Sequence, residues 1–472
     1  MPGVTDDLPL VSGPGEMNPL ETMMWRAEVD PRLRATVVIV DVLDAEPDWD
    51  RLVAAHEWAS RAVPRLRQRV VEPYGWGAPT WATDPDFALG FHLRRTRLSD
   101  GGSLRDLLDR AGLAMMTPFD RHRPLWEAEL VGGLDGGRAG YLLKVHHSLA
   151  DGLSLVQILG LLHSTVREHR GDKVDAPLPA ARPTSRLGAT AAQTGRAIAA
   201  TPSAVLDGLR SGASLLGGVA TAPLATAADG WNAVTSALAA AVPPSAPGSP
   251  LLRARGTNRR LEALDVDLAP LRAAGRAVGG SLNDAYLAAL LGGLRRYHLA
   301  LDAPVPAYIP MGMPVNTRDP SDPMGGNRWA GIRFAAPLDD VDPAARIARV
   351  HAIVREVTGA RVVDALGIIA PLLAALPSPL LTRIQGGATS ANDLQASNIP
   401  GMRRPTYLAG ARIERSYPFA PLPGGALMIA LTSHEDTCCV AVTLDPAAVT
   451  DPDLLRECLV AGFDEVLALA GD

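Results

Sequence analysis

The chain has 472 residues, of which 47% are apolar and 20% charged. Its length suits two domains with a connector, and its apolar content is enough for two cores, which excludes wholesale disorder. With 45 basic and 51 acidic residues the net charge is −6, which argues against a dedicated nucleic-acid-binding protein. Three cysteines, Cys438, Cys439 and Cys458, cannot form a disulfide framework and favour a reducing cytosol.

The N-terminal segment Met1–Leu20 is acidic and rich in proline and glycine, without the basic and apolar regions of a signal peptide. No uninterrupted apolar run reaches the length of a membrane-spanning helix. We therefore expect a cytoplasmic protein, with peripheral contact at the inner membrane or at lipid bodies left open.

The first half of the chain alternates strand and helix signals. A buried strand is predicted at Ala35–Val42 and a helix at Trp49–Val63. Leu125–Val131 and Tyr141–His147 are two expected strands, and the glycine-rich residues between them predict a hairpin. A helix with an apolar face follows from Gly152.

Prolines and alanines dominate from Gly171 to about Leu251, which predicts a long connector with some helix. We therefore divide the chain into an N-terminal domain (1–175), a linker (176–252) and a C-terminal domain (253–472). The C-terminal elements expected are strands at 259–267, 304–310, 326–337, 394–399, 407–417, 426–431 and 437–444, and helices at 281–298, 343–358 and 451–470.

Several motifs of common enzymes are absent from the sequence. It contains no phosphate-binding loop, no dinucleotide-binding G-x-G-x-x-G after a strand, and no serine flanked by glycines in the pattern of a nucleophile elbow. It also lacks HExxH and C-x-x-C zinc motifs. Kinases, Rossmann dehydrogenases, serine esterases and zinc proteases therefore lose their main support.

The most informative segment is His146-His147-Ser148-Leu149-Ala150-Asp151-Gly152. Neighbouring side chains on a strand point to opposite faces, so only one of the two histidines can face a given cleft. Such a histidine can act as a general base near neutral pH, and Gly152 would permit a tight turn before the helix. Ordinary packing of both histidines, and a metal site formed with Asp151, are the alternatives.

This segment resembles the HHxxxDG motif of the wax ester synthase/acyl-CoA:diacylglycerol acyltransferase family. Four other segments are similar to motifs of that family and occur in the same order along almost the whole chain. They are Pro19–Glu28 at the N-terminus, Pro124-Leu125-Trp126 ahead of the histidines, Ser281-Leu282-Asn283-Asp284 at a helix start, and Ser397-Asn398-Ile399-Pro400-Gly401.

The resemblance implies an α/β fold with two chloramphenicol acetyltransferase-like domains and an active-site channel between them. It implies an acyl-CoA-dependent O-acyltransferase, with acyl-CoA as co-substrate, no cofactor and no metal. His147 would be the general base, and His146 would face away from the channel or support its neighbour. Asp151 would be a structural anchor paired with an arginine, and Asn283 an oxyanion donor, although Asn283 and Asp284 are equally suited to capping the helix.

Substrate contacts are expected from the other motif residues, as channel wall or core. These residues are Pro124, Leu125, Trp126, Ser281, Asp284, Asn398, Pro400 and Gly401, with Pro400-Gly401 forming a turn. Arg253, Arg255, Arg259 and Arg260 are candidates for the phosphates of coenzyme A, by clustering only.

Three functions stay open at this point. The first is synthesis of triacylglycerol or wax ester, the second is transfer to a specialised acceptor such as a glycolipid or secondary-metabolite hydroxyl, and the third is a non-catalytic lipid-binding protein. Because diacylglycerol and long-chain alcohols are insoluble, the first requires peripheral membrane contact. The apolar segment Val362–Leu381 is the candidate, and burial in the C-terminal domain is its alternative role.

Overall fold

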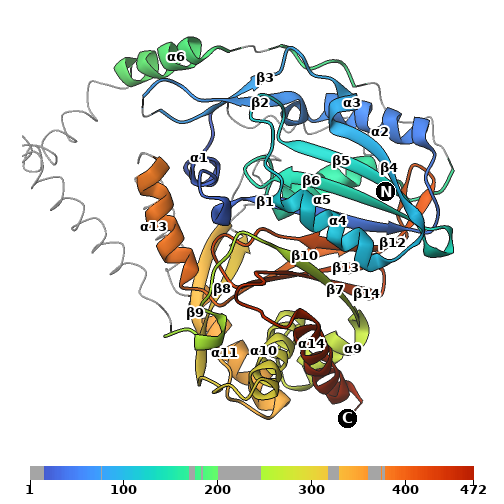
Figure 1. Cartoon of the computed structure of the whole chain (residues 1–472), viewed down its shortest axis with the longest axis vertical. Helices are drawn as coiled ribbons and strands as arrows, with labels where there is room; N and C mark the ends of the chain where they lie inside the picture. The colour runs from blue at the N-terminus through green and yellow to red at the C-terminus, as the bar shows by residue number, and fades with distance from the viewer. Residues whose placement is uncertain are drawn as a thin grey trace, which may run out of the picture.

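The computed structural model describes residues 15–75, 77–168, 176–181, 184–199, 246–316, 329–359, 374 and 378–471. These residues build two six-stranded sheets and a small two-stranded one, with helices packed around them (Figure 1). The sheets divide the molecule into an N-terminal half, mostly blue to green in Figure 1 with one orange-red strand from late in the chain, and a C-terminal half, yellow-green to dark red.

The sheet of the N-terminal half has the strand order β11-β12-β1-β6-β5-β4. The hairpin predicted from its glycine-rich connection is confirmed, since β5 and β6 pair antiparallel across a short 3₁₀ turn. Every residue of β1 and β6 is buried, so the two central strands are covered on both faces. The strands are β1 (Thr36–Leu43), β4 (Leu93–Gly102), β5 (Trp126–Leu134), β6 (Ala139–His146), β11 (Tyr407–Leu408) and β12 (Ala411–Phe419).

Strand β12 belongs to the N-terminal sheet, whereas the sequence prediction assigned residues 407–417 to the C-terminal domain. It pairs antiparallel with β1, so that Val40 lies opposite Tyr417 in the N-terminal sheet. The same strand packs against β13 and β14 of the other sheet. Its alternating pattern predicts a strand but does not specify the partner, because the hydrogen bonds of either sheet edge would satisfy it.

The sheet of the C-terminal half has the order β7-β14-β13-β10-β8-β9. β14 has the predicted limits, whereas β8 begins four residues later than expected. The strands are β7 (Arg260–Asp267), β8 (Tyr308–Asn316), β9 (Trp329–Pro337), β10 (Leu394–Met402), β13 (Leu427–His434) and β14 (Thr437–Leu444).

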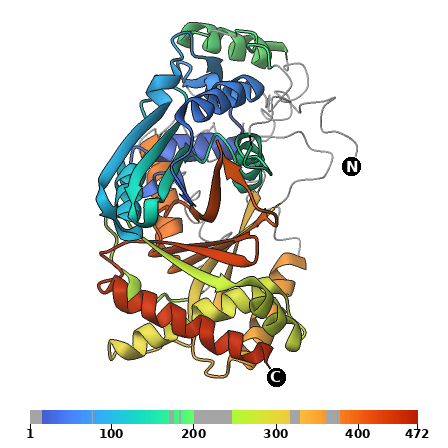
Figure 2. The same cartoon turned by 90° about the vertical axis from the view of Figure 1, so that its right-hand side faces the viewer.

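Four helices, α9, α10, α11 and α14, form a layer on the C-terminal sheet, on the side away from the N-terminal half (Figures 1 and 2). α9 follows β7 directly and was not predicted; its proline occupies the first turn, where a missing N–H costs nothing. The helices are α1 (Pro19–Ala27), α2 (Trp49–Ala62), α3 (Leu89–His92), α4 (Leu104–Met116), α5 (Gly152–Leu162), α6 (Arg186–Ala199), α9 (Leu268–Ala277), α10 (Leu282–Ala300), α11 (Pro343–Gly359), α13 (Ser378–Ser390) and α14 (Pro452–Leu467).

A buried apolar cluster joins the two halves. It combines Val40 of β1 and Phe419 of β12 with Leu261 of β7 and Ala441 of β14. Each half also has its own core beneath its helices. Because burial of apolar area stabilises by roughly 25 cal/mol per Å², this shared cluster holds the two sheets in a fixed relation.

The described parts of the linker belong to different halves. Helix α6 packs on the small sheet formed by β2 (Gln68–Val71) and β3 (Thr80–Thr83), where Ala189 is buried. At the other end, the Ser249 backbone N–H donates to Asp393 in the C-terminal half. Most of the predicted connector, 200–245, lies outside the described residues.

Candidate active site

The HHxxxDG segment occupies a strand–turn–helix junction. β6 ends at His146, whose backbone N–H donates to Leu125 O on β5 at 3.0 Å. The His147 N–H donates to Ala35 O, just before β1, at 2.7 Å. The Leu149 N–H then returns to His146 O at 2.8 Å, and α5 begins at Gly152. Both histidines therefore sit where the sequence predicts them.

The His146 side chain is fully buried and faces away from solvent. Its Nδ1 accepts hydrogen bonds from the Ser148 backbone N–H at 3.1 Å and from Ser148 Oγ at 2.6 Å. Because Nδ1 accepts, the ring proton of the neutral imidazole is on Nε2. The edges of Trp25 and Phe119 flank the ring, each with its centroid 6.0 Å away. A supporting position for His146 agrees with this geometry.

Glu28 lies against the free side of the His146 ring. Its Oε1 accepts from the Ala35 N–H at 3.0 Å and lies 3.1 Å from His146 Nε2, in a close contact that falls short of a well-aligned hydrogen bond. Burial opposes ionisation of this carboxyl, but His146, the Ala35 amide and Arg121 together lower the pKa of Glu28 below its ordinary value. Glu28 is therefore an anion held beneath the histidine pair.

Asp151 caps helix α5. Its Oδ1 accepts from the Ser154 N–H at 2.8 Å, and its side chain is buried at the helix start. The cap satisfies one of the N–H groups that a helix start leaves unpaired. A structural anchor was predicted for Asp151; the arginine expected beside it stays a prediction.

Gly152 does not have the role expected from the sequence. The glycines with positive φ in the described chain do not include it, so no tight left-handed turn requires a glycine here. Its missing side chain instead faces Ile399 of β10, where an added Cβ would lie 3.4 Å from Ile399 Cδ1. The start of α5 thus contacts the C-terminal half at the Ser397–Gly401 motif.

That second motif forms a bulge rather than the predicted turn. β10 runs parallel to β13 from Leu394 to Ile399, and the register shifts before Met402 pairs with His434. At Gly401 an added Cβ would lie 1.7 Å from Ser433 O, so only glycine allows the two backbones to approach. The side chains of Asn398 and Pro400 are exposed on this strand.

The Ser281–Asp284 motif opens helix α10 with a capping box. Ser281 Oγ accepts from the Asp284 N–H, and Asp284 Oδ2 accepts from the Ser281 N–H at 2.8 Å. Asp284 is buried and its Oδ2 also lies 2.8 Å from Nδ1 of His351 on α11. Capping therefore accounts for Ser281 and Asp284, whereas Asn283 is not the cap.

Asn283 lies in the first turn of α10 and is partly buried. Its Nδ2 is 3.8 Å from Sδ of Met313 on β8. β8 pairs with β10, because Leu394 lies opposite Met311. The asparagine thus contacts, from the helix layer, the sheet that carries the Ser397–Gly401 motif.

Pro124, Leu125 and Trp126 are all buried, so they belong to the core of the N-terminal half and not to an open surface. Trp126 Nε1 donates to Leu66 O at 2.7 Å. Together with His56, Leu149 and Leu155 it lines a small apolar cavity, which offers about 10 Å³ of room to the centre of a water molecule. Leu149 connects this cavity to the histidine motif.

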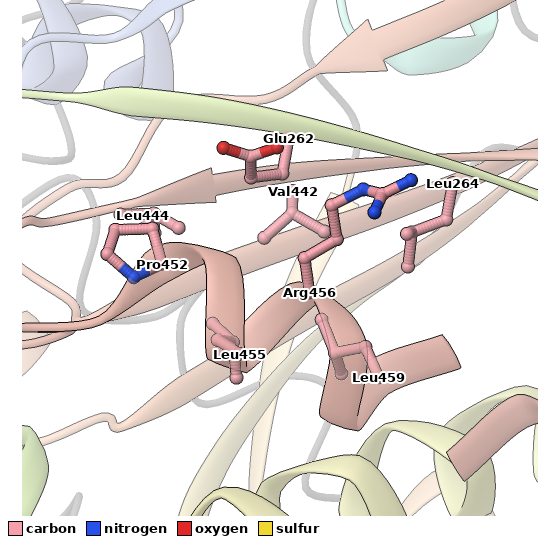
Figure 3. A pocket seen from close by; sticks show the side chains of 8 residues that line it. All are labelled: Glu262, Leu264, Val442, Leu444, Pro452, Leu455, Arg456 and Leu459. Carbon is pink, nitrogen blue, oxygen red and sulfur yellow. The ribbon is translucent and has the colours of Figure 1, made fainter. Parts of the chain in front are cut away.

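A second hollow lies far from the motifs, between α14 and strands β7 and β14 (Figure 3). Leucine, valine and proline side chains line it, together with the charged side chains of Glu262 and Arg456. The Glu262 carboxylate is paired with Arg105 and Arg260, and the hollow touches none of the motif residues, so we exclude it as the active site.

Three of the four arginines considered for coenzyme A phosphates are already engaged. Arg255 and Arg259 donate to backbone carbonyls, and burial lowers the pKa of both. Arg260 pairs with Glu262 and Asp453. These side chains hold the linker end and β7, so they do not form an open phosphate site; Arg253 is exposed.

The segment Val362–Leu381 lies outside the described residues except for Ala374 and 378–381, where Leu381 is buried. Within the described ranges, no helix combines the length and apolar character needed to cross a bilayer. The same ranges contain no group of three His, Cys, Asp or Glu residues arranged to hold a metal ion.

Sequence reasoning missed two residues of this region. Glu28 is 118 positions from His146, and His351 is 67 positions from Asp284. Glu28 was part of the N-terminal segment that resembles the family, but nothing in the local pattern indicates a histidine as its partner. His351 falls within a predicted helix without any distinguishing neighbour.

Comparison with known proteins supports the sequence resemblance. Residues 17–286 match the profile described as "Wax ester synthase/diacylglycerol acyltransferase catalytic domain", and residues 325–466 match "WS/DGAT C-terminal domain". A protein of Mycobacterium tuberculosis (strain ATCC 25618 / H37Rv) named "putative diacylglycerol O-acyltransferase" is 41% identical over 457 residues, which are 97% of this chain and 92% of that protein.

Solved structures share the fold. "Wax ester synthase/diacylglycerol acyltransferase from Marinobacter aquaeolei VT8" superposes with a TM-score of 0.64 at 22% identity, covering 97% of this chain and 100% of that one. The first condensation domain of the CDA synthetase gives 0.58 at 18% identity, covering 98% and 97%. The predicted architecture of two α/β halves is therefore confirmed.

Proposed function

Because the chain belongs to the wax ester synthase/diacylglycerol acyltransferase family, we propose that it moves a fatty acyl group from coenzyme A to a lipophilic hydroxyl. The acceptor is diacylglycerol, giving triacylglycerol, or a long-chain alcohol, giving wax ester. One observation carries the proposal: the histidine motif at the start of α5 contacts the Ser397–Gly401 motif of β10 through Gly152 and Ile399. Two family motifs from the two halves of the molecule thus meet at one junction.

We assign the general base to His147. It removes the proton of the acceptor hydroxyl while that oxygen attacks the thioester carbonyl, which forms a tetrahedral oxyanion. Collapse of the oxyanion breaks the carbon–sulfur bond and releases the coenzyme A thiolate, which takes the proton from His147. No acyl-enzyme and no bound cofactor take part. The hydrogen bond from the His147 N–H to Ala35 O supports a fixed position for this base.

Asn283 is our candidate for stabilising the oxyanion. It lies in the first turn of α10, where the helix dipole favours negative charge, and its amide can donate. Asp284, fixed by Ser281 and His351, holds that first turn in place. Packing against Met313 is the alternative role of Asn283. If packing is its only role, Asn283→Ala lowers the melting temperature and leaves kcat unchanged.

The base assignment is tested with purified protein and a thiol-release assay for free coenzyme A. Loss of a general base costs roughly 10²- to 10⁴-fold, so His147→Ala should reduce turnover of palmitoyl-CoA by that factor. His146→Ala is the matched control, and it should keep measurable activity because it removes a supporting ring only. Equal activity in both variants would refute His147 as the base.

The acceptor is determined in the same assay. Dipalmitoylglycerol, hexadecanol and glycosylated lipids are offered in parallel with palmitoyl-CoA. Release of coenzyme A with the first or second supports triacylglycerol or wax ester synthesis. Turnover confined to the glycosylated lipids would instead assign a specialised acceptor to the same site, and release with none of them would favour a lipid-binding protein.

We further propose that the protein contacts a lipid surface peripherally to collect its insoluble substrates. The candidate segment is Val362–Leu381, which the sequence supports by its apolar composition and its flanking arginines. Replacing Leu372 and Leu373 with serine should reduce flotation with liposomes and activity on emulsified diacylglycerol. Activity on a short soluble alcohol is the control; if it falls as well, together with the melting temperature, the segment belongs to the core.

A further inference from the structure

Four consecutive backbone N–H groups surround the base, and each has a partner. His146 donates to Leu125 O, His147 to Ala35 O, and Leu149 to His146 O. The Ser148 N–H donates to the imidazole of His146. The acceptors of His147 and Ser148 are the Ala35 peptide and the His146 ring, and both of these contact the carboxylate of Glu28.

The first connection runs through the backbone. Glu28 Oε1 accepts from the Ala35 N–H at 3.0 Å, and the Ala35 carbonyl accepts from the His147 N–H at 2.7 Å. Ala35 is the residue before β1, where no ladder bond to a neighbouring strand holds its N–H. The carboxylate therefore fixes the peptide that in turn fixes His147.

The second connection runs through the His146 ring. Because Nδ1 accepts from Ser148, the ring presents its Nε2–H to the carboxylate 3.1 Å away. Side-chain exposure is zero for His146 and 10% for Glu28, so water competes little for either group. Trp25 and Phe119 restrict rotation of the ring.

We propose that Glu28 is a positioning residue for the acyl transfer, which sets the place of His147 through Ala35 and through the His146 ring. This inference rests on the proposed role of His147 as base. A general base must lie within about 3 Å of the hydroxyl that it deprotonates, and a displacement of about 1 Å can reduce the rate about 100-fold. Glu28 touches no reacting atom, so its contribution is to kcat and not to substrate affinity.

Glu28→Gln is the informative substitution, because it keeps the shape and removes the charge. Both contacts end on Oε1, so a glutamine oxygen in that position can still accept from the Ala35 N–H and face the Nε2–H of His146, and the substitution removes the charge alone. Hydrogen bonds to a neutral acceptor are about half as strong as those to a carboxylate, so the Ala35 peptide and the His146 ring are held less firmly. We expect kcat to fall 10- to 100-fold with the KM for palmitoyl-CoA and for hexadecanol unchanged.

Glu57→Gln is the matched control. Glu57 also binds two partners in the N-terminal half, Arg61 and Arg67, but it lies outside the site and should keep the kcat of the unmodified enzyme. Calorimetric titration with coenzyme A counts intact sites per chain. A purely structural role for Glu28 would lower this number and leave kcat per site unchanged, which would overturn the proposal.

A double variant tests the route through the ring. If Glu28 acts partly through His146, the losses from Glu28→Gln and His146→Ala do not multiply in the combined variant. Losses that multiply, or a wild-type kcat in Glu28→Gln, would overturn the proposal. Should Glu28→Gln fail to fold, Glu28→Asp retracts the charge by one methylene and must lower kcat without changing KM.

Failure of this inference is distinguishable from failure of the proposed function. If His147→Ala is active, the base assignment is wrong whatever Glu28→Gln does. If His147→Ala is inactive while Glu28→Gln keeps full kcat, the base stands and only the positioning role of Glu28 is refuted.

Discussion

Asp393→Asn should make the protein more stable at neutral pH. Asp393 lies just before β10 and is 3% exposed. Its Oδ2 accepts from the Ser249 N–H at 2.6 Å, which fastens the end of the linker to the C-terminal sheet. Burial raises the pKa of this carboxyl from 3.8 to about 6, although the Ser249 amide and Arg255 favour the charged form.

The magnitude follows from this pKa. A rise from 3.8 to about 6 corresponds to about 3 kcal/mol, the cost of ionising the carboxyl in the fold. Because the folded pKa is raised, the folded state binds the proton more tightly than the unfolded one. The stabilisation by this proton is complete below pH 3.8 and is lost as pH rises through about 6. An asparagine keeps the acceptor for Ser249 and carries no charge, so Asp393→Asn should gain up to about 3 kcal/mol at pH 7.5.

Urea denaturation at several pH values measures the effect. The gain of Asp393→Asn over the unmodified protein should fall to about half of its pH 7.5 value at pH 5 and to about a fifth at pH 4. Asp436→Asn, at an exposed position between β13 and β14, is the control and should show no such convergence. A gain that is independent of pH, or a destabilisation at pH 7.5, would refute the reasoning from burial.

Three other outcomes are expected. Gly401→Ala should lower the melting temperature severely or prevent folding, because the added Cβ would lie 1.7 Å from Ser433 O. Gly160→Ala in α5 is its control: open space surrounds Gly160, so the free energy of unfolding should rise by up to about 1 kcal/mol. Asp151→Ala should lower the free energy of unfolding by at least the roughly 1 kcal/mol of a helix cap, and should also lower kcat. The matched Ser281→Ala should lower the free energy of unfolding by a similar amount, and a fully stable but inactive Asp151→Ala would point to direct catalysis. A chelator should leave thiol release unchanged, and a loss restored by zinc would favour the metal interpretation of the histidine motif.

Local signals in the sequence were sufficient for much of the fold and for the location of the motifs. The hairpin of β5 and β6 follows from alternating apolar residues around a glycine-rich turn. Helix α10 follows from its capping box, and the strand–turn–helix around His147 from the change in period after a buried strand. These features depend on residues within a few positions of one another, so the local sequence pattern is enough to predict them.

The motifs alone could not specify the contacts among these segments. The pairing of β12 with β1 joins residues almost 380 positions apart, and the alternation of either strand fits several partners. The bulge at Gly401 depends on Ser433 on the neighbouring strand, which is why the sequence predicts a turn there instead. The same limit applies to Gly152, whose neighbour Ile399 comes from the other half.

The sequence by itself determined where the histidine motif lies, because a histidine after a buried strand and before a capped helix is a local arrangement. Only the tertiary structure decided what holds that histidine in place. Glu28 contacts His146 and the Ala35 amide because α1 and β6 are brought together by the core of the N-terminal half. Burial in that core makes an ordinary glutamate and an ordinary histidine a fixed pair, and burial is a property of the packed fold rather than of either residue.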